Sequence, residues 1–106
     1  MDRPANGSHV VDPGTVEWAA TDTPGFWEKV LLSNVDGGTT TLMRIDPGAF
    51  ADLHHHDQLE EILVLDGEFS DQDRTYGPGH YCIRAPGAEH TSYSATGCTV
   101  LLVFRP

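Results

Sequence analysis

Three consecutive histidines, residues 54–56, are the side chains of this chain best suited to metal chemistry. In an extended strand, residues two apart project from one face with Cα atoms about 6.5–7 Å apart, so His54 and His56 can bind one ion together while His55 points away. Glu60 follows four residues after His56, and a carboxylate that returns after a short bend can complete such a site. Imidazole with carboxylate suits Zn, Fe, Mn or Ni, whereas a solvated histidine run would show the same spacing without binding a metal.

Glycines frame these residues, and a second histidine segment follows later in the chain. The two segments read Gly48-x5-His54-x-His56-x3-Glu60-x6-Gly67 and Gly79-x7-Gly87-x2-His90. They resemble the two sequence motifs of the cupin superfamily, the first at every spaced position. The second departs from the pattern at Ala85, where proline is usual, and at Ser94, which replaces the closing asparagine. Neither departure touches a histidine or a carboxylate.

Nearly the whole chain after Trp18 is also similar to the cupin domain of ChrR-type anti-sigma factors. The stretches that carry this similarity are residues 60–71, 76–81, 86–91 and 97–98. In that family the matching residues bind zinc. The resemblance therefore implies a mononuclear metal site whose ligands are His54, His56, Glu60 and His90.

Glu61 is the rival carboxylate, because some cupins have four residues between the histidine and the glutamate. The spacing to Gly67 and the ChrR-type match both favour Glu60. Glu61 is then expected at the rim or the surface of the barrel.

Length and charge narrow the functions that the chain can have. At 106 residues it is expected to form one domain, residues 1–106, with a loosely ordered N-terminal arm over residues 1–13. Six basic and sixteen acidic residues give a net charge of −10, which argues against nucleic acid as a partner. No apolar run is long enough to span a bilayer and no signal peptide is evident, so we expect no membrane partner and a cytoplasmic location. Cys82 and Cys98 are expected to be reduced.

Short apolar runs between Gly/Pro turns predict an all-β fold, a single-domain antiparallel barrel or jelly roll of nine or ten strands. The expected strands cover residues 16–20, 26–33, 39–45, a segment from near 52, 60–65, 68–71, 80–84, a segment around 90, and 98–105. The last one is almost continuously apolar and is expected to be buried on both faces. Period-2 alternation places Ser92 and Ser94 inward with His90, and Tyr93 outward.

Four other side chains are candidates for catalysis. Arg44 and Arg84 fall inside expected strands; either could hold an anionic substrate in the barrel, but the interpretation we favour for each is an outward position paired with a carboxylate. Tyr76 and Tyr81 could donate to a ligand on the metal, although a tyrosine on a strand more often packs with its hydroxyl satisfied.

Two functions are expected from this site. The first is a metal-dependent enzyme of the dioxygenase, isomerase or lyase type that binds a small oxygenated or anionic metabolite at Zn, Fe, Mn, Ni or Co. The second, which the ChrR-type resemblance implies, is a non-catalytic zinc- or ligand-sensing module. In that family a sigma-binding domain precedes the cupin; since this chain shows none, we expect a stand-alone protein and favour the enzyme. A two-fold homodimer is expected from the apolar edges and from the habit of cupins.

Overall fold

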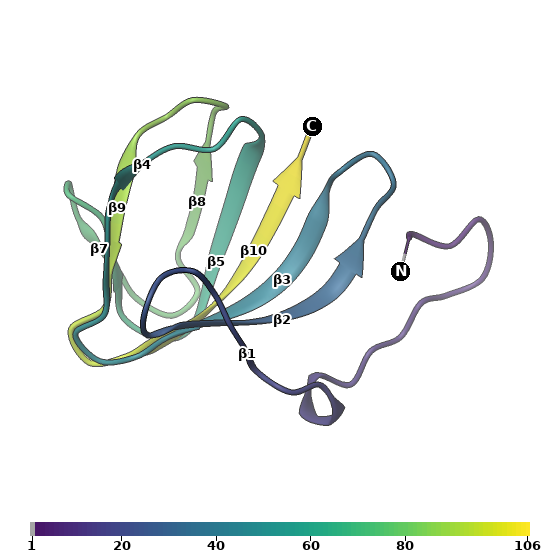
Figure 1. The fold of residues 1–106 in the computed structure, drawn as a ribbon, viewed down its shortest axis with the longest axis horizontal. Coiled ribbons are helices and arrows are strands. Elements are labelled where there is room, and N and C mark those ends of the chain that lie inside the picture. Colours follow the sequence, from purple (N-terminus) through teal and green to yellow (C-terminus); the bar gives the residue numbers. More distant parts are fainter. Residues whose placement is uncertain (1) are drawn as a thin grey trace.

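A computed structural model describes residues 2–106 and shows ten β-strands arranged as two antiparallel sheets that face one another (Figure 1). The strands are β1 (Ala19–Ala20), β2 (Phe26–Ser33), β3 (Thr39–Ile45), β4 (Phe50–His54), β5 (Leu59–Gly67), β6 (Phe69–Ser70), β7 (Thr75–Tyr76), β8 (Tyr81–Arg84), β9 (His90–Tyr93) and β10 (Cys98–Arg105). The six-stranded sheet has the order β1-β2-β3-β10-β5-β8 and the four-stranded sheet the order β4-β9-β6-β7. The predicted antiparallel barrel is confirmed.

Three of the long strands have the predicted limits, whereas most of the other strands differ from the predicted limits by one or more residues. β2, β3 and β10 begin and end where the sequence predicts. β1 is limited to Ala19–Ala20, because only these residues find partners on β2 and a 3-10 turn, Pro13–Thr15, forms before them. This turn is the only helical element in the described part of the chain. β4 begins at Phe50 rather than near residue 52, since Phe50 already pairs with Tyr93 on β9.

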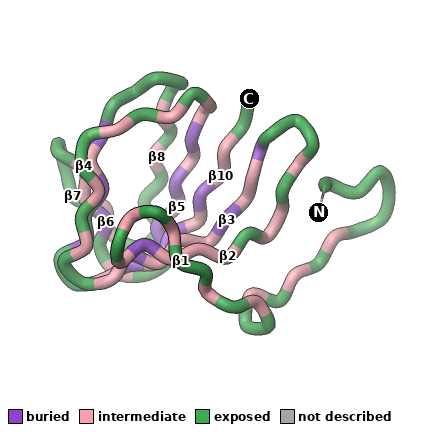
Figure 2. Tube along the Cα trace, in the orientation of Figure 1, coloured by how far each residue is buried: buried purple, intermediate pink, exposed green. Residues whose placement is uncertain are grey.

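The core lies between the two sheets and is built from alternate residues of the long strands (Figure 2). Its most buried apolar members are Ile45, Ile62, Val64 and Val100, each no more than 2% exposed. The expectation that β10 is buried on both faces is wrong. Its inward residues Cys98, Val100 and Leu102 are buried, but Thr99, Leu101 and Val103 are only half-buried, because none of the elements described for residues 2–106 packs as a second layer over β10 on the outer face.

Strand register brings the two motif segments together. His54 at the end of β4 lies opposite His90 at the start of β9, and Glu60 on β5 lies opposite Arg84 on β8. Gly67, which closes the first motif, has a φ of 74°, and a Cβ there would overlap the carbonyl oxygen of Gly97. Only glycine fits that close approach of β5 to the turn before β10.

The sequence also predicts reduced cysteines and no segment that spans a membrane. Cys82 and Cys98 are free, and β5 lies between the strands that carry them, so they cannot meet across a pair of neighbouring strands. None of the helical structure within residues 2–106 has the length and apolar character needed to cross a bilayer.

Candidate metal centre

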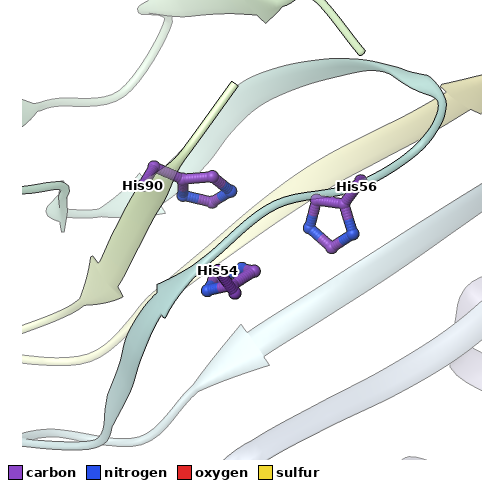
Figure 3. A group of neighbouring side chains, drawn as sticks. All are labelled: His54, His56 and His90. Carbon is purple, nitrogen blue, oxygen red and sulfur yellow. The ribbon is translucent and has the colours of Figure 1, made fainter. Parts of the chain in front are cut away.

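Three histidines converge at one end of the space between the sheets (Figure 3). His54 ends β4, His90 begins β9, and His56 lies in the segment that leads from β4 to β5. One ring nitrogen from each residue lies within 4.8 Å of the others, a spacing that could hold a single metal ion. The backbone of His56 is held by Gly87, whose N–H donates to the His56 carbonyl oxygen over 2.8 Å. The loop before β9 therefore positions one histidine of the first motif directly.

Glu60 brings a carboxylate to the same place. Its Oε2 lies 3.5 Å from His56 Nε2 and its Oε1 lies 3.5 Å from His90 Nε2. Glu60 and His90 are 3% and 2% exposed, yet Glu60 Oε1 and His90 Nε2 have no hydrogen-bond partner. Buried polar atoms without partners are costly and rare. These two atoms fit a bound cation, which would satisfy both at once.

Hydrogen bonds at Nδ1 of His54 and His90 leave the Nε2 atom of each ring available to a metal. His54 Nδ1 lies 2.6 Å from the carbonyl oxygen of Asp52, and His90 Nδ1 lies 3.0 Å from that of Thr91. A carbonyl can only accept, so each Nδ1 carries the proton and donates it. Each Nε2 is then left with a free lone pair, which is the arrangement that backbone carbonyls impose on metal-binding histidines.

Burial sets the protonation of this cluster. Burial and the nearby Arg84 charge lower the pKa of His90 from 6.5 to about 4, and burial lowers the pKa of His56 as well. Both rings are therefore neutral at pH 7, so their contacts with Glu60 are not ion pairs. Burial raises the pKa of Glu60 from 4.5 to about 7, although Arg84 opposes this. A divalent cation would supply the positive charge that the Glu60 carboxylate lacks.

Arg84 lies behind Glu60, and its charge is shared by two carboxylates. Its Nε is 3.4 Å from Glu60 Oε1, and its Nη2 donates to Asp71 Oδ2 over 2.9 Å. Tyr76 donates to the same Asp71 oxygen over 2.7 Å. Burial would raise the pKa of Asp71, but these bonds and two backbone N–H groups hold it at about 2. The chain from Tyr76 to Glu60 thus fixes the orientation of the carboxylate.

The outward position favoured for Arg84 is therefore wrong, since its side chain is only 13% exposed. The cause is the register, which puts Arg84 on the inner face opposite Glu60. Arg44 does lie outside, near Asp46 and over the rings of Trp18 and Trp27.

Two more candidates lie away from the histidines. Tyr81 is 53% exposed and donates to Glu61, which also meets Arg105. Glu61 is thus half-buried on the face of β5 that points away from the histidines, and its contacts are with Tyr81 and Arg105. His55 is also turned away from the cluster, with its ring toward Asp57.

A cavity of about 580 Å³ adjoins the cluster. Its walls are mainly apolar and come from both sheets, and all four proposed ligands reach it. The lining includes Phe26, Met43, Ile45, Ile62, Phe69, Val100, Leu102, Phe104, His54, His56, Glu60, His90 and Ser92. Ser92 faces inward as predicted and Tyr93 outward. A volume of this size suits a small molecule.

Three acidic residues of the cavity were missed by sequence reasoning. They are Asp22 in the turn between β1 and β2, Glu28 on β2, and Asp52 on β4. Glu28 could have been found, because it follows the buried Phe26 by two residues and so shares its face. Among residues 2–106, none of the candidates Arg44, Tyr76, Tyr81 and Arg84 lines this cavity.

Solved structures with the same fold include chains of different kinds. The chain is similar to the anti-sigma factor ChrR of Rhodobacter sphaeroides, solved in complex with SigE, at 27% identity and a TM-score of 0.74 over 86% of this chain and 50% of that chain. An RmlC-like cupin from Shewanella frigidimarina matches at 21% identity and a TM-score of 0.82, over 94% of this chain and 92% of that chain. The polyketide cyclase RemF from Streptomyces resistomycificus matches at 23% identity and a TM-score of 0.79, over 92% and 79%.

These likenesses establish the fold as a cupin β-barrel. The chain spans only half of the ChrR chain that it matches, so the activity and partners of that larger protein do not carry over with the fold. Comparison with curated protein sequences gives no match. Residues 6–106 match the sequence model of the ChrR cupin-like domain, which covers nearly all of the chain. The chain therefore belongs to the ChrR cupin-like domain family.

Proposed function

We propose that this protein is a metal-dependent enzyme of the dioxygenase, isomerase or lyase type that acts on a small oxygenated molecule in the barrel. One observation carries the proposal: three histidines and a carboxylate border a mainly apolar cavity of about 580 Å³, and two of these residues, Glu60 and His90, have buried atoms without a hydrogen-bond partner. Apolar walls with a few convergent polar groups are usual for small-molecule sites.

His54 and His90 would bind the metal through Nε2, as their hydrogen bonds dictate, and His56 and Glu60 would complete the ligand set. Imidazole with carboxylate suits Zn, Fe, Mn, Ni or Co. When bound, such an ion would serve as a Lewis acid or a redox centre for a chelating oxygenated molecule. The chain's own part is to hold Glu60 in place through Arg84 and to enclose the ligand among apolar side chains.

Cobalt substitution tests whether the centre is open to a ligand. Six- or five-coordinate cobalt absorbs weakly, and a small bidentate oxygen ligand should change the spectrum saturably if the protein leaves positions free. The expected result is a saturable change with the protein ligands retained. An intense tetrahedral spectrum that no such ligand alters would refute the enzyme and leave a closed site.

The family match favours a second candidate, a non-catalytic zinc- or ligand-sensing module. Four protein ligands can satisfy tetrahedral zinc completely, which is the usual form of a structural site. The cobalt spectrum separates the enzyme from a module with a closed zinc site, because only the closed site predicts indifference to chelators.

A two-fold homodimer in the cytoplasm completes the proposal. Its support is the outer face of the six-stranded sheet, where Tyr81, Leu63, Leu101 and Leu42 lie opposite one another across four strands. Ile83 on the same face is 54% exposed. An apolar face of this kind is commonly covered by a partner. The free cysteines Cys82 and Cys98 fit a reducing compartment.

A further inference from the structure

The charged groups around the cavity are all of one sign. Four carboxylates line it, those of Asp22, Glu28, Asp52 and Glu60, and no lysine or arginine does so among residues 2–106. A divalent ion at the histidines would offset two of these four charges. The remainder of the cavity would still be negative, so it would attract cations and repel anions.

Arg84 cannot reverse this polarity. Its guanidinium contacts Glu60 and Asp71, and these contacts hold it behind Glu60. Arg44, the other candidate anchor for an anion, lies on the outer face between two tryptophans. An anionic group deep in the cavity would therefore meet no cation except the metal itself.

Glu28 is the carboxylate best placed to contact the end of a ligand that lies away from the histidines. It is half-buried on the inward face of β2, opposite Met43, and its carboxylate forms no ion pair or hydrogen bond within residues 2–106. Glu28 on β2 and Glu60 on β5 are three strands apart in the sheet. Across the strands, Glu28 is aligned with Val100 of β10, whereas Glu60 is aligned with Phe104, further along the same strand. Those steps correspond to roughly 14 Å across the strands and 13 Å along them, measured over the curved sheet. Glu28 and the histidines therefore lie at well-separated parts of one cavity.

We propose that the cavity selects a small, largely apolar ligand whose end remote from the metal is neutral or positively charged, and that Glu28 recognises this end. The inference builds on the proposed function, since the metal holds the oxygenated head of the ligand. It narrows the expected substrate class: an anionic head can bind at the metal, but a second anionic group at the other end is excluded.

The test uses cobalt-loaded protein and three ligands with one chelating head: benzohydroxamate and its derivatives with a para-carboxylate or a para-aminomethyl group. Their dissociation constants are read from the cobalt absorption at fixed ionic strength. We expect the carboxylate derivative to bind about tenfold more weakly than the parent, because its para-carboxylate would be repelled by the Glu28 carboxylate with little screening inside the cavity. The aminomethyl derivative should bind at least as tightly as the parent.

Glu28→Gln should narrow the difference between the two charged derivatives, whereas Glu68→Gln, which removes an exposed charge outside the cavity, should leave it unchanged. A carboxylate derivative that binds as tightly as the parent would overturn the inference while leaving the proposed function standing. Equal effects of the two variants would also overturn it, because the selectivity would then reflect net charge alone. A spectrum that none of the three ligands changes would overturn the proposed function and the inference with it.

Discussion

Glu60→Gln should have opposite effects on the metal-free and the metal-bound protein. Without a metal, the wild-type protein buries a carboxylate whose pKa is raised from 4.5 to about 7, even though Arg84 lies beside it. Each pKa unit corresponds to about 1.4 kcal/mol, so the ionised carboxylate destabilises the metal-free fold by about 3 kcal/mol at pH 8. Glutamine is nearly isosteric and carries no charge, and it removes this cost.

The sign of the pH dependence follows from proton linkage. Since the folded pKa of Glu60 lies above its unfolded value, its contribution to stability is present below pH 4.5 and is lost as the pH rises through about 7. The variant lacks this loss. The difference in free energy of unfolding between Glu60→Gln and the wild type should therefore grow in favour of the variant by about 2–3 kcal/mol between pH 5 and pH 8.

Urea unfolding of chelator-treated protein at these two pH values measures the stability, and competition with a chelator measures the metal affinity. With metal present the order should reverse, because the amide cannot offset the charge of the cation. Glu61→Gln is the matched control: its partners Tyr81 and Arg105 lie at the surface, so it should change neither quantity strongly. A metal-free Glu60→Gln protein that is less stable than wild type at pH 8 would refute the electrostatic reasoning. Weaker metal binding by Glu61→Gln than by Glu60→Gln would reassign the carboxylate ligand.

Three further predictions follow from the same contacts. His54→Ala and His90→Ala should each weaken metal binding by at least about a hundredfold, whereas His55→Ala, whose ring is turned away, should retain near-equimolar metal by elemental analysis. Full metal occupancy in both ligand variants would contradict the site. Arg84→Met should lower the free energy of unfolding by about 3–5 kcal/mol, because Glu60 and Asp71 lose their shared cation. Arg44→Met, at a more exposed ion pair, should lower it by about 1 kcal/mol or less, and equal losses of stability in the two variants would argue against the buried pairing. Light scattering at micromolar concentration should give twice the chain mass of 11.6 kDa and Ile83→Asp should return the monomer, whereas a wild-type monomer would refute the dimer.

β2, β3 and β10 could be predicted from the sequence because each is an uninterrupted run between turns, whereas β5 (Leu59–Gly67) extends past the predicted limit at residue 65. β2, β3 and β10 are bounded by Gly25, the Asp36-Gly37-Gly38 turn and Gly97, and their limits follow from these residues. The two-residue strand β7 could not be found, since two residues show no period. The early start of β4 also could not, because it depends on pairing with β9, a partner more than forty positions away.

The features of the site likewise differ in whether they follow from neighbouring residues or depend on the pairing of distant strands. The spacing of His54, His56 and Glu60 is local but is shared by a solvated histidine run, and the metal site was predicted because the second motif, with His90, also resembles the cupin pattern. The inward position of Arg84 depends on its pairing with Glu60 across β5 and β8, which no local pattern encodes. The charge of the cavity is likewise a property of the assembled barrel, since Asp22, Glu28 and Asp52 come from three separate segments.

The position of Arg84 bears on whether the metal centre serves catalysis or structure. A closed structural site needs its ligands held rigidly, and the contacts of Arg84 with Glu60 and Asp71 provide this without any cavity. The space in front of the histidines therefore has no structural purpose in holding the ion. Mainly apolar walls with a few convergent polar groups are the usual make-up of a small-molecule site, and about 580 Å³ of such space adjoins the four proposed ligands. This supports a centre whose work is done together with a bound small molecule.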